Sequence, residues 1–150
     1  MLTDNQIILR LVLTVILSGL IGFERQSHGR TAGLRTHILV ALGSCLIMLT
    51  SIHVFDIYKE ITKLDPARIA AGVITGIGFL GAGTIIREQE GVRGLTTAAS
   101  LWVIAGIGLA CGCGFLNAAI YATVLALVVL FLLRHIELLV FSENREKRKN

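Results

Sequence analysis

The stretch FLNAAIYATVLALVVLFLL, Phe115–Leu133, is 19 residues long and contains no charged side chain. A helix rises about 1.5 Å per residue, so roughly 20 apolar residues are enough to cross about 30 Å of hydrocarbon. This stretch therefore predicts a transmembrane helix. Because it is rich in Leu, Val and Ala and has no Gly, we expect much of its surface to face lipid.

Four similar apolar stretches come before it in the chain. They are Ile7–Phe23, Leu34–Val54, Ile69–Ile86 and Thr97–Cys113, and none of the five contains Asp or Glu. Arg10 lies one turn from the end of the first stretch, where a long side chain can reach outward to the headgroups. The sequence therefore predicts an all-α, polytopic helical bundle with about five transmembrane helices over residues 1–141. A basic tail, residues 142–150, follows it.

The overall composition supports a membrane protein and excludes other classes. Hydrophobic residues make up 54% of the chain and charged residues 16%, and the mean hydropathy is +0.77. A soluble domain usually has about a quarter of its residues charged. These values exclude a disordered chain, a nucleic-acid-binding module and an ordinary soluble enzyme. Cys45, Cys111 and Cys113 lie within apolar stretches, which is not typical of a disulfide scaffold.

The positions of Lys and Arg predict how the helices are oriented. With five spans, ten of these residues fall on one side of the membrane and four on the other. Because positive charge is enriched in cytoplasmic segments, we expect the amino end outside and the carboxyl end in the cytoplasm. If the last two spans formed one bent helix across Gly112–Gly114, the tail would lie on the opposite side.

Two features are expected between the second and third spans. Phe55–Pro66 repeats apolar residues every three positions, which predicts a short interfacial helix; a plain polar loop is the alternative. Asp65 and Pro66 then open the third span together with Arg68. Asp before a Pro is typical of a helix cap, and a cation or regulatory site is the second interpretation of this outer end.

Small residues mark the third and fourth spans. Gly72 and Gly76 lie one turn apart on one face, which allows another helix to approach closely. The motif GFLGAG, with Gly78, Gly81 and Gly83, indicates either tight packing or local unwinding that exposes the backbone to a ligand. We expect these two spans to form the protein-facing centre of the bundle.

Most of the unusual polar residues lie in two predicted cytoplasmic loops. The candidate functional residues there are Glu24, Arg25, Arg30, Arg35 and His37 in the first loop, and Arg93, Thr96 and Thr97 in the second. Glu24 with Arg35 or Arg93 is a candidate structural ion pair; an anion-binding or partner-binding patch is the alternative. No Ser/His/Asp or Cys/His set and no full set of metal ligands is evident, so we expect no catalytic, metal or cofactor site.

Three motifs in order resemble the MgtC/SapB family of bacterial inner-membrane proteins. They are GFERQ (Gly22–Gln26) with AGLRTHILVALGS (Ala32–Ser44), DPARIAAGVITGIGFLGAGTI (Asp65–Ile85) and VRGLTTAASLW (Val92–Trp102). The resemblance implies a multi-pass plasma-membrane protein linked to growth at low magnesium, acid tolerance and virulence. The family pattern usually has Gln at the position of Gly72, and many members continue into a cytoplasmic carboxyl-terminal domain.

The scarcity of charge inside the spans bears on function. Mg²⁺ requires near-octahedral oxygen ligands, and the five stretches contain no acidic residue. We therefore expect a non-enzymatic regulator that packs against copies of itself or another membrane protein within the lipid bilayer. In some relatives that partner is the proton-driven ATP synthase. The alternative is a Mg²⁺ or other ion transporter or channel, formed by an oligomer around the Gly-rich third helix.

Overall fold

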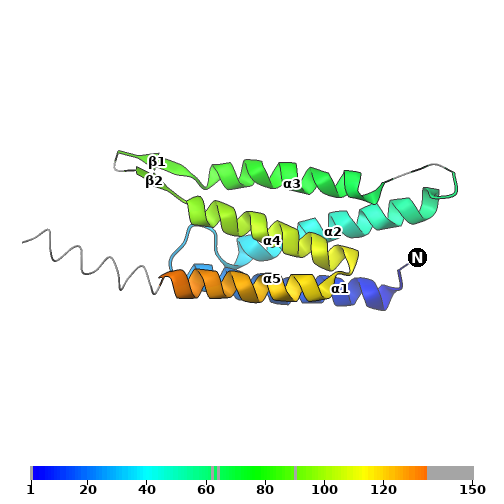
Figure 1. Cartoon of the computed structure of the whole chain (residues 1–150), viewed down its shortest axis with the longest axis horizontal. Coiled ribbons are helices and arrows are strands. Elements are labelled where there is room, and N and C mark those ends of the chain that lie inside the picture. Colours follow the sequence, from blue (N-terminus) through cyan, green and yellow to red (C-terminus); the bar gives the residue numbers. More distant parts are fainter. Residues whose placement is uncertain (1, 62, 64, 90, 135–150) are drawn as a thin grey trace, which may run out of the picture.

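The computed structural model describes residues 2–61, 63, 65–89 and 91–134, and these residues form a bundle of five helices (Figure 1). The helices are α1 (Asp4–Ser27), α2 (Leu34–Tyr58), α3 (Pro66–Gly83), α4 (Leu95–Cys113) and α5 (Leu116–Val128), the last extended by a π-helical turn, η1 (Val129–Leu133). All five spans are long and apolar enough to cross a membrane, which confirms the predicted helical membrane bundle. The predicted basic tail lies outside the described residues.

The helix boundaries follow from local capping. Thr3 and Gln6 form a reciprocal capping box at the start of α1. At the start of α3, the Asp65 carboxylate accepts a hydrogen bond from the Ala67 amide at 2.8 Å, so the capping interpretation of Asp65 is confirmed. Gly114 has φ of +88° and ends α4, and this left-handed cap allows the chain to reverse into α5. The last two spans are therefore separate helices, and the single bent helix is excluded.

Helix α4 lies at the centre of the bundle. It packs against each of the other four helices, and half of the residues in its 18-residue apolar stretch are buried. The main core contains Leu17 and Ile21 of α1, Cys45 of α2 and Ile104 and Ile107 of α4. Helix α5 is largely exposed, as expected for a lipid-facing helix.

The structure corrects three expectations. Helix α3 lies at an edge of the bundle, mainly against α2 and α4, so only α4 is central (Figure 1). The predicted interfacial helix is not separate: Phe55–Tyr58 prolong α2 because no helix breaker precedes them, and 59–61 form a turn. Where a loop was expected from Arg87 onward, β1 (Ile86–Glu88) and β2 (Gly91–Arg93) pair as the two antiparallel strands of a hairpin, with Ile86 opposite Arg93.

Helix α3 is also continuous through GFLGAG. It remains α-helical to Gly83, so local unwinding, one of the two interpretations of this motif, is wrong. A helix satisfies its own backbone hydrogen bonds, whereas an unwound segment at membrane depth needs other partners. Gly81 instead packs against Ala98 of α4, with 3.6 Å between the Ala98 Cβ and the position a Cβ would take on Gly81.

The glycines fall into two groups. Gly108 and Gly112 of α4 lie against the backbone of α2, where a Cβ on Gly112 would come within 2.7 Å of the Cys45 carbonyl oxygen. By contrast, a Cβ on Gly72 or Gly76 of α3, or on Gly106 of α4, would meet nothing within 4 Å among the described residues. The first group closes the α2–α4 interface, and the second lies on outer faces.

This division predicts opposite effects for the same substitution at two neighbouring positions. Gly108→Ala should lower the free energy of unfolding by about 1–3 kcal/mol, because its Cβ would come within 2.8 Å of the Ser44 Cβ. Gly106→Ala should be neutral or stabilising by up to about 1 kcal/mol, because Ala favours a helix over Gly. Unfolding of the purified protein in micelles measures both; equal effects would contradict the assigned α2–α4 contact.

Candidate functional site

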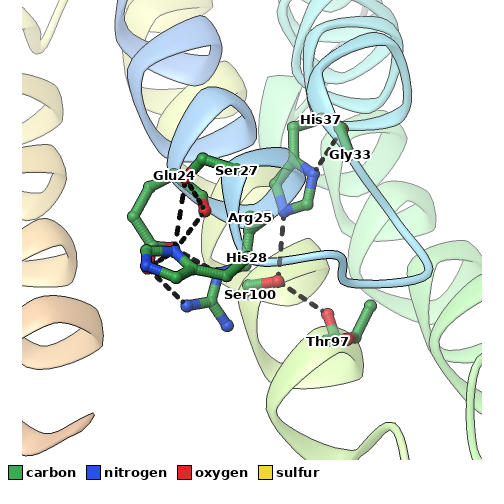
Figure 2. A network of polar contacts seen from close by, with 8 residues as sticks. All are labelled: Glu24, Arg25, Ser27, His28, Gly33, His37, Thr97 and Ser100. Atoms are coloured by element: carbon green, nitrogen blue, oxygen red, sulfur yellow. Dashed lines mark hydrogen bonds and ion pairs between the residues drawn. The ribbon is translucent and has the colours of Figure 1, made fainter.

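The α1–α2 loop and the β-hairpin lie at the same end of the bundle, which we call the hairpin end (Figure 1). A network of polar side chains from α1, α2 and α4 is buried just inside it (Figure 2). This is where the structure brings together several of the candidate residues that are far apart in the sequence.

Glu24 and Arg25 form a buried ion pair on the last turn of α1. The Arg25 side chain is only 2% exposed and that of Glu24 10%. Arg25 donates from Nη2 to Glu24 Oε1 at 2.8 Å and from Nε to Oε2, and His28 Nδ1 lies 3.0 Å from Oε1. The predicted pairing of Glu24 with Arg35 or Arg93 is therefore wrong, since a neighbouring Arg reaches both carboxylate oxygens.

His37 provides the link between α2 and α4. Its ring is fully buried, with Nδ1 2.9 Å from the Gly33 carbonyl oxygen and Nε2 3.1 Å from the Ser100 hydroxyl. Ser100 Oγ also lies 2.8 Å from the Thr97 carbonyl oxygen (Figure 2). The chain Gly33–His37–Ser100–Thr97 thus ties the start of α2 to the first turns of α4.

Two protonation states of His37 are compatible with this series of hydrogen bonds, and neither requires a heavy atom to move. Nδ1 must carry a proton because the Gly33 carbonyl only accepts. With a neutral ring, the Ser100 hydroxyl donates to Nε2. With a charged ring, Nε2 donates to Ser100, whose own proton turns to the Thr97 carbonyl. A rotation of one hydroxyl therefore accommodates either state.

The candidate residues separate into buried and exposed groups. Glu24, Arg25, His37 and Thr97 are buried: Glu24 and Arg25 pair within α1, whereas His37 joins α2 to α4 through Ser100. Arg30, Arg35, Arg93 and Thr96 are exposed at the hairpin end, where Arg93 pairs with Glu88 across the hairpin at 3.0 Å. Asp65 and Arg68 are exposed at the opposite end of the bundle and do not join this site. Gly78 and Gly83 lie on exposed parts of α3.

The sequence interpretation missed two polar contacts. Ser100 was not singled out, because one Ser in an apolar helix is common; its position three residues after Thr97 was the available signal. Arg10 was expected to reach outward. Instead its Nη1 donates to the Gly112 carbonyl oxygen at 2.6 Å, at the carboxyl end of α4, where a cation is favourable.

The chemistry of the site is that of a structural clamp. Every buried side-chain nitrogen and oxygen among the described residues has a hydrogen-bond partner. Those residues also include no cluster of three His, Cys, Asp or Glu side chains suited to a metal ion. The network therefore ties the start of α2 to the first turns of α4, and it neutralises the buried charges of Glu24 and Arg25 within α1.

Removing one partner of the buried ion pair should be costly. Arg25→Met leaves the Glu24 charge without its bidentate partner and should lower the free energy of unfolding by about 3–5 kcal/mol. The double variant Glu24→Gln with Arg25→Met should recover a large part of that loss, because no buried charge remains. Unfolding in micelles measures both, and a double variant no more stable than the single one would contradict a charge-based cause.

Comparison with known proteins identifies relatives over most of the chain. The family model described as MgtC family matches residues 11–139. Over 141 residues the chain is 44% identical to "Putative magnesium transporter YhiD" of Escherichia coli (strain K12), and over 145 residues it is 47% identical to "Protein MgtC" of Salmonella typhimurium (strain LT2). An uncharacterized protein of Haemophilus influenzae is 37% identical over 143 residues.

The matched regions cover the chain almost fully but the relatives only in part. They span 93–94% of this chain, 66% of the Escherichia coli protein and 60% of the other two. The chain therefore corresponds to less than two thirds of the length of these relatives. No solved structure matches it significantly.

Proposed function

Because the chain belongs to the MgtC family, we propose that it is a non-enzymatic membrane regulator that acts by binding other membrane helices through the outer face of α3. We define this outer face by Gly72 and Gly76. The proposed partner is a second copy of the chain or another inner-membrane protein, of which the proton-driven ATP synthase is one candidate.

The observation that carries this proposal is the open space at Gly72 and Gly76. Both are exposed, they lie one helical turn apart, and a Cβ on either would meet nothing within 4 Å among the described residues. Lipid drives helices together only weakly, so small residues that permit close backbone approach are favoured where membrane helices associate.

The use of other glycines in the same chain supports this interpretation. Gly22, Gly108 and Gly112 each allow a helix of this chain to approach closely. Gly72 and Gly76 have the same spacing as Gly108 and Gly112 but no helix against them in the described chain. A helix from outside the chain would complete the same kind of contact.

The proposed orientation places the hairpin end in the cytoplasm. In the structure, the start of α1 and the end of α5 lie at opposite ends of the bundle, as five antiparallel spans require (Figure 1). Six described arginines lie near the hairpin end, which favours a cytoplasmic position under the positive-inside rule: Arg25, Arg30, Arg35, Arg87, Arg93 and Arg134.

Blocking the outer face of α3 tests the proposal. Gly76→Ile should leave the amount of inserted protein unchanged, because its side chain would enter open space. It should reduce association in the membrane at least about tenfold, the loss expected when a bulky group prevents close helix packing. Förster transfer between labelled copies, and co-purification with a membrane partner, measure association; growth of a deletion strain at low magnesium measures function.

Gly106→Ile is the matched control, since Gly106 is also exposed and open but lies on α4. It should retain association and growth. Normal function of Gly76→Ile, or equal loss in both variants, would show that binding does not depend on the outer face of α3.

Magnesium transport is the second candidate, favoured by the name of the Escherichia coli relative. A pore between copies of α3 would have to use its backbone carbonyls, yet the carbonyls of a continuous α-helix accept hydrogen bonds within the helix. We therefore expect liposomes containing the purified protein to show no Mg²⁺ or proton flux above that of empty liposomes. Saturable Mg²⁺ flux would contradict the regulator and support a transporter.

A further inference from the structure

An apolar groove opens between α2, α3 and α4 at the hairpin end. Its volume is about 390 Å³, and its lining is almost entirely apolar. The main lining residues are Thr36 and Val40 of α2, Phe79, Leu80 and Gly83 of α3, and Leu101 of α4. Leu101 is buried at 1% exposure, whereas Phe79 is 83% exposed, so the groove extends from the core to the outer surface.

Gly83 leaves this groove open. It is helical, and a Cβ built on it would meet nothing within 4 Å among the described residues. The last two residues of the GFLGAG motif, Ala82 and Gly83, line the groove. Because their side chains are small or absent, they leave space in it.

Two arginines lie close in sequence to residues that line the groove. Arg35 is next to the lining residue Thr36, and Arg87 is three residues after the lining residue Thr84. Both arginines are exposed, and neither has an ion pair among the described residues. Glu88, the nearest described acid in sequence, pairs with Arg93 instead.

The start of α2 adds hydrogen-bond donors at the same place. Its N-cap, Gly33, has no side chain to cap the helix, and Gln26 accepts only from the Leu34 amide, at 3.1 Å. The amides of Arg35 and Thr36 and the Thr36 hydroxyl have no acceptor among the described residues. These donors, on the same helical turn as Arg35, are suited to an anion at the level of the headgroups.

We propose that this groove binds an anionic phospholipid, with an acyl chain against Phe79, Leu80 and Gly83 and the phosphate near Arg35, Arg87 and the first turn of α2. The two halves of the site match the two halves of such a lipid. A free anion would use only the polar half, and a zwitterionic lipid would bring its own positive charge to the arginines. This inference is independent of the proposed helix partner, which would bind at Gly72 and Gly76, nearer the start of α3.

Native mass spectrometry of the full chain in detergent tests the site, with phosphatidylglycerol and phosphatidylcholine of the same acyl chains as probes. Phosphatidylglycerol should bind more tightly. Arg35→Gln and Arg87→Gln should each lower its affinity about fivefold and the double variant about 30-fold, as expected for loss of one cation each near a headgroup. Arg30→Gln removes an exposed arginine from the preceding loop and should leave the affinity unchanged.

Filling the groove provides a second test. Gly83→Leu should lower phosphatidylglycerol affinity at least about tenfold, because its side chain would occupy the space of the acyl chain. Gly106→Leu, equally open but outside the groove, should have no effect. Gly76→Ile should retain lipid binding, so failure of the helix-partner proposal would leave this result intact.

Three outcomes would overturn the lipid site. Equal affinity for the two lipids would show that the arginines do not select a headgroup. Unchanged binding in the double arginine variant or in Gly83→Leu would place the lipid elsewhere. Complete displacement by millimolar inorganic phosphate would show a free-anion site without a role for the acyl chain.

Discussion

The constraint on which this structure depends is that hydrocarbon offers no hydrogen bonds. Every polar group placed inside the spans must therefore find its partner within the protein. Thr14, Ser18, Ser44 and Thr123 do so locally, by donating to carbonyls of their own helices. The groups that cannot do so, such as the charged Glu24 and Arg25 and the His37 ring, form contacts that join helices or neutralise each other at the hairpin end.

Close helix approach is the second requirement, and glycine provides it in two places. Between α2 and α4, Gly108 and Gly112 allow near contact of backbones, and this interface places α4 at the centre of the bundle. On α3 the same spacing faces outward, because α3 packs on the bundle through a different side, with Ala70, Val73, Ile77 and Gly81. An edge helix with an open small-residue face is consistent with a protein that works through contacts to other helices.

The hairpin end combines a rigid interior with a charged exterior. In the interior, His37 and Ser100 tie α2 to α4 and the Glu24–Arg25 pair is buried within α1 (Figure 2). Arg30, Arg35 and Arg93 are exposed at the same end. Residue types in the two predicted loops indicated candidate polar residues there, but the pairing did not follow from them. Glu24 pairs with Arg25 and not with Arg35 or Arg93, because the guanidinium of the adjacent residue reaches both carboxylate oxygens at the end of α1.

The sequence alone determined the five spans and indicated the cap at Asp65, because span length and capping are local properties. The reversal at Gly114 was settled by its left-handed backbone in the structure. The resemblance carried by its motifs also indicated the family. Only the tertiary structure decided which glycines are covered, that α3 lies at the edge, and that Ser100 is the partner of His37. These depend on which faces of separate helices meet, and in an almost uniformly apolar chain periodicity does not distinguish a face that meets protein from one that meets lipid.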